Sequence, residues 1–597
     1  MKRATALGLI LLCALPLFLR LWPIQHGMPR NYVFDTHVVK GALGMAQDKD
    51  LAPPAGRYST YPNLLPYVLL PVYGAEYAWG RATGEWGGAE EFGMQLKERP
   101  ELAHLPARVT LAALAALSAL FVFLTARAAG LARGAWIAAY LTATALLHVH
   151  LSVQERPWAP MCTFFALSAW PAALYARSGR TRHLVLSGVA AGLAFATHQA
   201  GGLSLGLAGA AWLFGPKGWS GRAALERVAS GIAAVATFAV TGIVVGLPYL
   251  LLGLESENVV GDVEKIDGPW FEIGGLRFGF AFRLESTLKL GRAILGYDPV
   301  LVLSGLAGLG LALRSRATRA LGAFAAFYLL FFITNQADHV RYLGPLTVLF
   351  AWPAALFLDR LWSRGPAPRA VVLVLLALPL AQALRLGWVM RQPDTRALAE
   401  TALVDEYAAE RVACDIHGAL PPLTGPALER LAGQRALGGR EEHRRLLLEA
   451  GVPHPDGPGV DAVMLEAIID YDRRVGSSRV EAEDAVALSD DPNVALERLG
   501  VDLVLIVDTT PGDGRPALLL SDEPAQPDLR GRPQPKMPPL DVDPAPIATW
   551  SPSEGGSAVD DANLPSELTF PLTQIWRTSR PGPELSLHRF RRSDRGR

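Results

Sequence analysis

Apolar segments long enough to cross a lipid bilayer recur through the first two thirds of this sequence. A spanning helix needs about 20 mostly apolar residues, because the hydrocarbon core of a bilayer is about 30 Å thick. About eleven such windows can be counted, near residues 4–22, 107–127, 133–153, 157–176, 183–198, 200–215, 228–253, 299–313, 319–334, 342–359 and 370–390. With 50% hydrophobic and 19% charged residues, the chain is predicted to be a polytopic α-helical membrane protein.

The first apolar window, residues 4–22, follows Lys2 and Arg3, as the apolar part of a signal peptide would. It runs to spanning length and lacks a small-x-small cleavage pattern, so we interpret it as an uncleaved anchor. The three cysteines of the chain are scattered and imply neither a disulfide framework nor a metal cluster. A formal net charge of +0 gives no reason to expect a nucleic-acid partner.

Lys and Arg in the short loops predict the orientation of the bundle. Short-loop Lys and Arg are retained in the cytoplasm, so the side that holds Lys2 and Arg3 is expected to be cytoplasmic. The opposite short loops carry only Arg156 and Arg341. The cytoplasmic side then also holds Arg127, Arg133, Arg177, Arg180, Arg182, Lys217, Arg222, Arg227, Arg314, Arg316, Arg319, Arg360, Arg364 and Arg369.

A further apolar window, residues 63–80, is interrupted by Pro66 and Pro71 and is rich in Tyr and Trp. If it crossed the bilayer, the charge pattern would invert between the first helix and the rest of the bundle. We therefore predict a re-entrant or interfacial helix here.

Three longer segments are expected outside the cytoplasm: residues 23–106, residues 254–298 and everything after about residue 391. The predicted domains are a transmembrane bundle over residues 1–391, which includes the first two segments as outer loops, and an extracytoplasmic α/β domain over residues 392–597. Within the second domain we predict a helix over residues 394–412, strands at 501–508 and 584–590, and a Pro-rich irregular loop over 510–566. Asp502 and Asp508, which flank the first strand, are interpreted as strand-end caps.

Ionisable side chains gather in four loops on the predicted outer face. Each of these side chains, taken alone, could be an interfacial residue that faces water. Their occurrence in four loops on one face favours a shared site. Carboxylates together with cationic or imidazole groups could activate a hydroxyl group and hold a phosphate. His148 and His150 are two residues apart and would point in different directions on a helix, so no metal pair is expected there. The side chains are Asp35, His37, His148, His150, Glu155, Arg156, His198, Asp338, His339 and Arg341.

A series of short motifs then follows in order over residues 1–415. They are "FDTHVV" with Asp35, Tyr61-Pro62, "LPARVTL" with Arg108, "HLSVQERP" with Glu155, "GLAFATHQ" with His198, "RYLGPLTVLFAWP" with Arg341 and Tyr342, and "PDTRALAE". This order resembles the membrane glycosyltransferases of the GT-C type, in the branch of the protein O-mannosyltransferases and the lipid A aminoarabinose transferase. In three places the chain departs from the family pattern: Thr36 replaces a second acid, Glu155 replaces Asp, and His198 replaces Lys.

The resemblance implies an inverting transfer of a sugar from a polyprenyl-phosphate donor to a lipid, glycan or protein acceptor. Asp35 would be the general base, and Arg341 would be the first candidate for the phosphate. Further substrate-binding candidates are Tyr342, His198, Glu155, Arg108, His37 and Tyr61. No cofactor is implied, although divalent-metal dependence is left open. The protein would be integral to the cytoplasmic (inner) membrane and contact its lipids, with the N-terminus inside and the C-terminal domain in the periplasm.

Two other classes of function are compatible with the sequence. A transporter or flippase of lipid-linked material would use a basic outer cavity without chemistry, but it should carry polar groups near the midplane of several helices, and this chain has few. A non-catalytic relative would use its outer domain to bind a partner, and Thr36 is the residue that keeps this alternative open.

Overall fold

The computed structural model describes residues 2–30, 36–54, 56–59, 61–216, 218–254, 270–273, 276–279, 284–315, 318–334, 340–414, 421–434, 439–451, 457, 459–464, 492–508, 540–553 and 575–591. The chain divides into two compact units. The first comprises residues 1–25, 33–85 and 103–388, and the second comprises residues 26–32, 86–102 and 389–597. Parts of the first outer segment therefore belong to the same unit as the C-terminal region.

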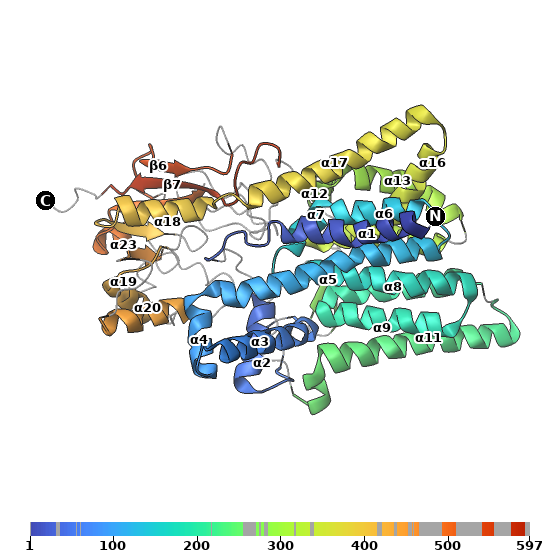
Figure 1. Ribbon diagram of the computed structural model, residues 1–597, viewed down its shortest axis with the longest axis horizontal. Coiled ribbons are helices and arrows are strands. Elements are labelled where there is room, and N and C mark those ends of the chain that lie inside the picture. Colours follow the sequence, from blue (N-terminus) through green and yellow to red (C-terminus); the bar gives the residue numbers. More distant parts are fainter. Residues whose placement is uncertain are drawn as a thin grey trace. The chain divides into compact units, whose positions relative to one another are not determined.

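The first unit is a helical bundle (Figure 1). Its helices are α1 (Lys2–Leu21), α2 (His37–Asp48), α3 (Leu64–Thr83), α5 (Pro100–Ala128), α6 (Gly134–Thr144), α7 (Leu146–Ser152), α8 (Trp158–Ser178), α9 (Thr181–Thr197), α10 (Leu205–Phe214), α11 (Gly221–Thr241), α12 (Leu284–Tyr297), α13 (Pro299–Arg314), α14 (Arg319–Thr334), α15 (Leu346–Leu349), α16 (Ala351–Trp362) and α17 (Pro366–Met390). Shorter elements are η1 (Gln199–Ser204), η2 (Gly242–Gly246), η3 (Pro248–Leu252), η4 (Val340–Leu343) and the antiparallel strands β1 (Trp270–Ile273) and β2 (Leu276–Gly279).

Every apolar window predicted from the sequence falls on one or more of these helices. Among the described residues, three helical stretches are long and apolar enough to cross a membrane: Pro100–Ala128, Gly221–Gly246 and Pro366–Glu406. The number rises to six if each of three bent helix pairs is one span. The structure therefore confirms a helical protein with membrane-spanning segments, whereas the count of about eleven stays a prediction.

The window at residues 63–80 forms one continuous helix, α3, which contains Pro71. It is not among the described helices that are apolar enough to span a membrane. Trp79 on this helix is 71% exposed, as expected for a side chain that anchors a helix at a membrane surface. Its interfacial placement remains a prediction.

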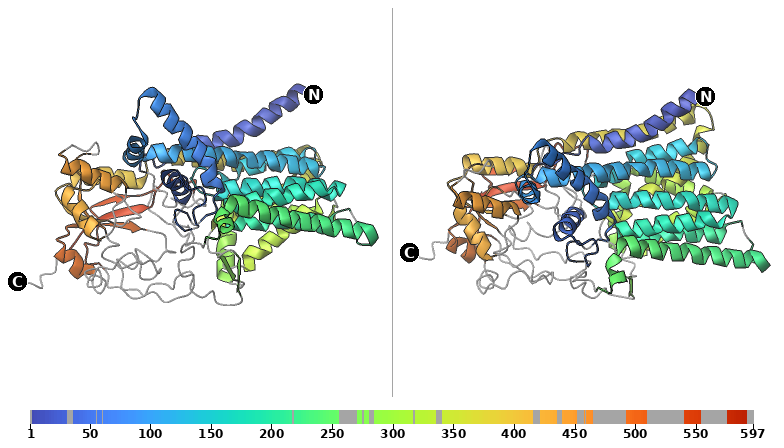
Figure 2. Two further views of the ribbon diagram at one scale, coloured as in Figure 1. Left: turned by 90° about the horizontal axis from the view of Figure 1, so that it is seen from below. Right: turned by 60° about the horizontal axis from the view of Figure 1, so that its bottom comes forward.

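Small residues allow the helices of the bundle to approach one another closely. Helices α8, α9 and α11 run side by side in both views of Figure 2, and α8 and α11 each pack against α9. A Cβ atom on Gly188 of α9 would lie 2.3 Å from the carbonyl oxygen of Ala234 on α11, and one on Gly192 would lie 2.8 Å from that of Phe238. Without a hydrophobic driving force inside a bilayer, close packing of this kind is what holds such helices together.

A buried arginine joins α1 to the neighbouring helices. Arg20 is fully buried and donates to the carbonyl oxygens of Pro16 (2.8 Å) and Ala143 (3.2 Å). It also donates to Ser152 Oγ (3.2 Å) and His148 Nδ1 (2.7 Å) on α7. Several acceptors therefore compensate the cost of burying the guanidinium.

Two bends in the bundle share one carboxylate. Helices α6 and α7 meet at a bend of 54°, and helices α12 and α13 meet at a bend of 108°. Asp298 lies between α12 and α13, and its oxygens accept the backbone N–H groups of Leu146 (2.6 Å) and Leu147 (3.2 Å) at the start of α7. At the bend between α6 and α7 these N–H groups have no intrahelical acceptor, and the carboxylate of Asp298 supplies one.

The second unit contains a mixed α/β fold. Its elements are α4 (Ala89–Glu98), α18 (Thr395–Glu406), β3 (Arg411–Cys414), α19 (Gly425–Gln434), α20 (Gly439–Glu449), β4 (Asp461–Met464), α23 (Pro492–Arg498), β5 (Leu503–Asp508), β6 (Ala548–Trp550) and β7 (Glu584–Arg589). The sheet has the order β4-β3-β5-β7-β6. Strand β3 is parallel to β4 and β5, whereas β7 is antiparallel to β5 and β6.

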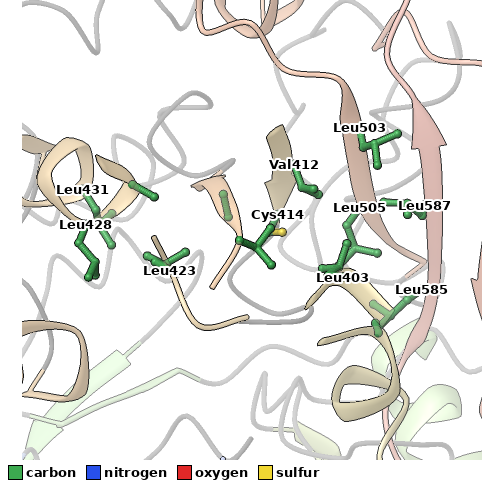
Figure 3. Close-up of a cluster of buried hydrophobic side chains, with 14 residues drawn as sticks. Leu403, Val412, Cys414, Leu423, Leu428, Leu431, Leu503, Leu505, Leu585 and Leu587 are labelled. Carbon is green, nitrogen blue, oxygen red and sulfur yellow. The ribbon is translucent and has the colours of Figure 1, made fainter. Parts of the chain in front are cut away.

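Leucines on one face of the sheet form the core of this unit. Leu503 and Leu505 of β5 and Leu585 and Leu587 of β7 belong to one cluster of buried side chains with Leu403 of α18 (Figure 3). All five side chains are fully buried. In β7 the leucines alternate with other side chains, whereas β5 is buried on both faces, with Val504 and Ile506 in a second cluster.

The predicted strands at 501–508 and 584–590 are confirmed as β5 and β7. The predicted helix over 394–412 is too long, because α18 ends at Glu406 and Arg411 begins β3. Strand β6 lies inside the stretch predicted to be irregular, and it pairs with β7. Of that stretch, residues 510–539 and 554–566 lie outside the described residues, whereas residues 540–553 are described. Asp502 acts as predicted, since its Oδ2 accepts the backbone N–H of Arg411 at 3.0 Å.

Replacing Gly188 with Ala should destabilise the bundle by about 1–3 kcal/mol, because the new methyl group overlaps the backbone of α11. Gly209→Ala on α10 is the matched control, because no atom lies within 4 Å of a Cβ at that position. Thermal unfolding of the two variants in detergent measures the difference. Equal unfolding temperatures would show that α9 and α11 do not pack in this way.

Candidate functional site

Trp158, the first residue of α8, lies at the centre of a group of polar aromatic side chains. Its ring centroid is 4.1 Å from that of His198, which follows α9, and 5.0 Å from that of Tyr342 in η4. The guanidinium carbon of Arg341 lies 5.4 Å from the Trp158 ring centroid and 5.7 Å from that of Tyr342. These distances allow cation–π attraction between Arg341 and both rings.

The group continues through two more rings. Tyr61 lies 5.2 Å from His198, and His37 at the start of α2 lies 5.7 Å from Tyr61, measured between ring centroids. Five residues proposed from the sequence to bind substrate are thus connected through Trp158. We refer to Trp158, His198, Tyr342, Arg341, Tyr61 and His37 as the ring cluster.

The backbone fixes the position of His198. His198 is the N-cap residue of η1, and its Nδ1 accepts the backbone N–H of Ala200 at 3.0 Å. Its own N–H donates to the carbonyl oxygen of Ala194 at 3.1 Å, and its carbonyl oxygen accepts from Gly201 at 2.7 Å. The side chain is held at the end of α9 by local hydrogen bonds before any ligand is present.

A second polar group surrounds Glu155, in the loop between α7 and α8. Glu155 Oε2 lies 2.8 Å from Arg108 Nε, and Oε1 lies 2.9 Å from His104 Nδ1. Arg108 also donates to the carbonyl oxygen of Ile24 at 3.2 Å. Both side chains of the Glu155–Arg108 pair are fully buried. The described contacts of Glu155 and Arg108 are thus with each other and with their neighbours, and substrate contacts of the two remain a prediction.

The environment keeps Glu155 ionised. Burial raises the pKa of its carboxyl group, but the Arg108 guanidinium and then His104 lower it more, so the pKa lies well below its usual range. An ionised carboxylate in a buried site requires such partners, because desolvation is costly.

The two groups are connected through the chain. Glu155 precedes Trp158 by three residues, so their Cα atoms are at most about 10 Å apart. The intervening Arg156 is buried. The loop before α8 therefore carries Glu155 of the ion pair and leads directly to Trp158 of the ring cluster.

Asp35, the predicted general base, lies outside the described residues, as do Asp338 and His339. The structure gives only the neighbours of Asp35: Thr36 precedes α2, and His37 is its first residue. Because His37 belongs to the ring cluster, the chain must pass close to this group at residue 36. Within the described part of the chain, no three or more His, Cys, Asp or Glu side chains gather as a metal site would require.

His148 and His150 have separate partners. His148 contacts Arg20 and Ser152, whereas His150 Nε2 lies 3.1 Å from Gln154 Nε2. Both side chains are buried in α7.

Two residues of this region were not singled out from the sequence. Trp158 follows "ERP" at the start of an apolar helix, and a tryptophan in such a position is easily taken for an ordinary interfacial residue. His104 precedes Arg108 by four residues, the spacing that places two side chains on the same face of a helix. That spacing is a signal that could have paired His104 with Arg108.

Replacing Glu155 with Gln should destabilise the protein by about 3–5 kcal/mol near neutral pH, because the variant leaves the Arg108 charge buried without its carboxylate. The folded-state pKa of Glu155 is depressed, so its contribution is present above the unfolded-state value and is lost as the pH falls. The difference in unfolding temperature between wild type and variant should therefore be smaller at pH 4 than at pH 7. Glu101→Gln, at an exposed pair with Arg99, is the control, and an equal effect of both variants would contradict the assignment.

The comparison of the sequence with protein families gives one match. Residues 94–245 match the family described as dolichyl-phosphate-mannose-protein mannosyltransferase. The matched region contains Arg108, Glu155, Trp158 and His198. No curated protein sequence matches the chain.

Solved structures give weaker likenesses. An oligosaccharyltransferase from Archaeoglobus fulgidus in the apo form has 13% identity and a TM-score of 0.38, with 83% of this chain and 70% of that chain covered. ArnT from Cupriavidus metallidurans bound to undecaprenyl phosphate has 16% identity and a TM-score of 0.40, with 68% and 73% covered. The arabinofuranosyltransferase AftD from Mycobacteria has 18% identity and a TM-score of 0.42, with 100% of this chain but 42% of that chain covered.

The likeness to a protein family is therefore limited to residues 94–245. That match covers the segment in which the Glu155 ion pair and the centre of the ring cluster lie. Residues 94–245 are thus similar to the dolichyl-phosphate-mannose-protein mannosyltransferase family, and the likeness covers 152 of the 597 residues.

Proposed function

We propose that this protein is an inverting glycosyltransferase that moves a sugar from a polyprenyl-phosphate donor to an acceptor on the outer face of the cytoplasmic membrane. The proposal places about eleven spans in the membrane, the N-terminus inside and the C-terminal unit in the periplasm. The transferred group would be a hexose or a pentose. The family description, which names a sugar on dolichyl phosphate, supports the class of donor.

The ring cluster is the observation that carries the proposal. Arg341 presents a guanidinium beside Trp158 and Tyr342, and a guanidinium matches the oxygens of a phosphate group in a bidentate way. Aromatic side chains with a few polar groups are the usual lining of a small-molecule site. The cluster therefore combines a cation for the donor phosphate with rings that can pack against a sugar.

The reaction needs one proton transfer. In the proposed step, Asp35 takes the proton of an acceptor hydroxyl or amine, and the acceptor atom bonds to the anomeric carbon from the face opposite the phosphate. The bond from that carbon to the phosphate oxygen breaks, and its electron pair leaves with the polyprenyl phosphate. Because the leaving group is already an anion, no acid catalyst is required, and positive charge from Arg341 would stabilise it.

The role of Glu155 and Arg108 in this proposal is to support the site. Their buried ion pair fixes the loop that leads to Trp158, so it would keep the ring cluster in place. A divalent metal is not part of the proposed step.

Purified protein incubated with a panel of radiolabelled polyprenyl-phosphate sugars tests the proposal. We expect release of free polyprenyl phosphate and transfer of the label to an acceptor. A transporter would move the lipid across reconstituted vesicles and leave the sugar attached, and a non-catalytic relative would do neither. Either outcome would overturn the proposed function.

Asp35→Asn should lower the turnover rate by roughly 10²–10⁴, the usual cost of removing a general base. Donor binding and the unfolding temperature should remain close to those of the wild type, because the amide keeps the size of the side chain. Asp48→Asn, at an acid near the end of α2, serves as the control. A variant Asp35→Asn that transfers sugar at the parent rate would contradict the role of this residue.

Arg341→Lys should weaken donor binding by about tenfold, since a lysine keeps the charge but loses the bidentate geometry and the stacking on aromatic rings. The dissociation constant of the donor, measured by isothermal titration, gives the result. Arg385→Lys is the matched control, because Arg385 also lies over a tryptophan ring, that of Trp388, in α17. Equal losses in both variants would point to a general effect on the bundle.

A further inference from the structure

The first outer segment contacts the C-terminal part of the chain at two places within the second unit. Residues 26–32 and 86–102 belong to this unit together with residues 389–597. At the first place, Arg30 Nε lies 2.8 Å from Glu400 Oε2 in α18. At the second place, α4 packs against α20. We refer to these as the Arg30–Glu400 contact and the α4–α20 contact.

The Arg30–Glu400 contact is largely shielded from water. The Arg30 side chain is 18% exposed and the Glu400 side chain is 5% exposed, and an ion pair in such a place is costly to break. Glu400 lies in the same helix as Ala399 and Leu403, whose side chains are fully buried in the core of the second unit. Arg30 is therefore held by a helix that packs on this core.

The α4–α20 contact also involves well-packed elements. Phe92 of α4 is buried, and its ring centroid lies 4.8 Å from that of Trp86, which is buried too. On α20, the buried Arg444 donates to the carbonyl oxygens of Leu423 at 2.6 Å and Gly457 at 2.8 Å. Hydrogen bonds therefore join α20, on which α4 packs, to two further segments of the C-terminal part of the chain.

The Arg30–Glu400 contact lies close along the chain to both groups of the candidate site. Arg30 precedes His37 of the ring cluster by seven residues, and Asp35 is one of the residues between them. Ile24, six residues before Arg30, accepts a hydrogen bond from Arg108 at 3.2 Å. Because the connecting stretches are short, the position of Arg30 limits the paths that the chain can take on either side of it.

The α4–α20 contact leads to the Glu155 ion pair. Helix α4 ends at Glu98, and α5 is one continuous helix from Pro100 onward. It carries His104 and Arg108, both of which contact Glu155. Because successive turns of a helix are joined by backbone hydrogen bonds, the first turn of α5 and His104 move together.

We propose that residues 389–597 position both ends of the first outer segment for the transfer reaction, with Glu400 as a positioning residue that acts through Arg30. This inference rests on the proposed function, and it goes further because it gives the C-terminal part of the chain a role in catalysis. The donor phosphate is assigned to Arg341 in η4, which neither contact includes. Loss of the Arg30–Glu400 contact should therefore lower kcat more than it weakens donor binding.

Glu400→Gln removes the carboxylate and keeps the size of the side chain. With a radiolabelled polyprenyl-phosphate sugar that the wild type consumes, we expect kcat to fall by about tenfold to a hundredfold, because a small misplacement at a reacting centre has an effect of this size. The dissociation constant of the donor should stay within about threefold of the wild-type value. Glu410→Gln is the matched control, because Glu410 lies 3.8 Å from Arg589 in a more exposed pair of the same unit. Equal values of kcat in the two variants would overturn the proposal.

Arg30→Gln and the double variant Arg30→Gln/Glu400→Gln test whether Glu400 acts through Arg30. If one contact carries the effect, kcat of these two variants should lie within about twofold of that of Glu400→Gln. Losses that multiply in the double variant would show that the two residues act separately, and would overturn the assigned role of Glu400.

Phe92→Ala tests the α4–α20 contact. The cavity that it leaves should loosen α4, and we expect kcat to fall by about tenfold as the first turn of α5 is displaced. Met94→Ala, at a side chain of the same helix that is 44% exposed, is the control. Equal values of kcat in Phe92→Ala and Met94→Ala would overturn this half of the proposal.

Hydrogen–deuterium exchange measured by mass spectrometry tests the Arg30–Glu400 contact without any substrate. In Glu400→Gln, the amides of residues 24–30 and of the first turn of α2 should exchange about tenfold faster than in the wild type, because the segment opens more often once this contact is lost. Strand β5 should exchange as in the wild type. Arg30→Gln, which changes no residue of α18 or the sheet, should give the same pattern.

The exchange result separates this inference from the proposed function. Unchanged exchange at residues 24–30 or at the first turn of α2 in both variants would overturn the inference alone, whatever the protein transfers. A wild type that consumes none of the polyprenyl-phosphate sugars would overturn the proposed function, and with it the role of Glu400 in catalysis.

Discussion

A charge that is buried away from water must have partners within the protein, and this requirement organises one end of the helical bundle. Glu155 is matched by Arg108 and His104. Arg20 is matched by two carbonyl oxygens, a serine and a histidine from α1, α6 and α7. Apart from the bond to the Pro16 carbonyl oxygen within α1, these contacts join segments that are far apart in the sequence. The polar groups therefore hold together the part of the bundle in which the ring cluster lies.

The sequence contains enough information to predict the helices but not their partners. Apolar windows indicate where helices lie because a bilayer requires a fixed length of apolar chain. The bend at Ala145 and its acceptor Asp298 have no such signal, because the two are more than a hundred residues apart and meet only after the chain folds. The same holds for Glu155, whose role depends on Arg108 and His104 rather than on its own neighbours in the sequence.

In the second unit, a continuous apolar run with residues of strong β-propensity predicted β5. A stretch with alternating leucines, which the structure buries, predicted β7. Strand β6 has only three residues, Ala548–Trp550, and it lies in a stretch rich in Pro, Asp and Ser. Its pairing with β7 provides the stability that its own sequence does not. Tertiary pairing of this kind also explains why the predicted helix over 394–412 stops early, as Val412 pairs with Leu503 in the sheet.

The position of Asp298 has a mechanical consequence. Its backbone belongs to the bend before α13, whereas its carboxylate holds the first turn of α7. A displacement of the beginning of α13 must therefore either carry α7 with it or leave two amide groups without an acceptor. Since α7 leads directly into the loop of Glu155 and Trp158, the carboxylate of Asp298 connects the start of α13 with the segment that carries this loop.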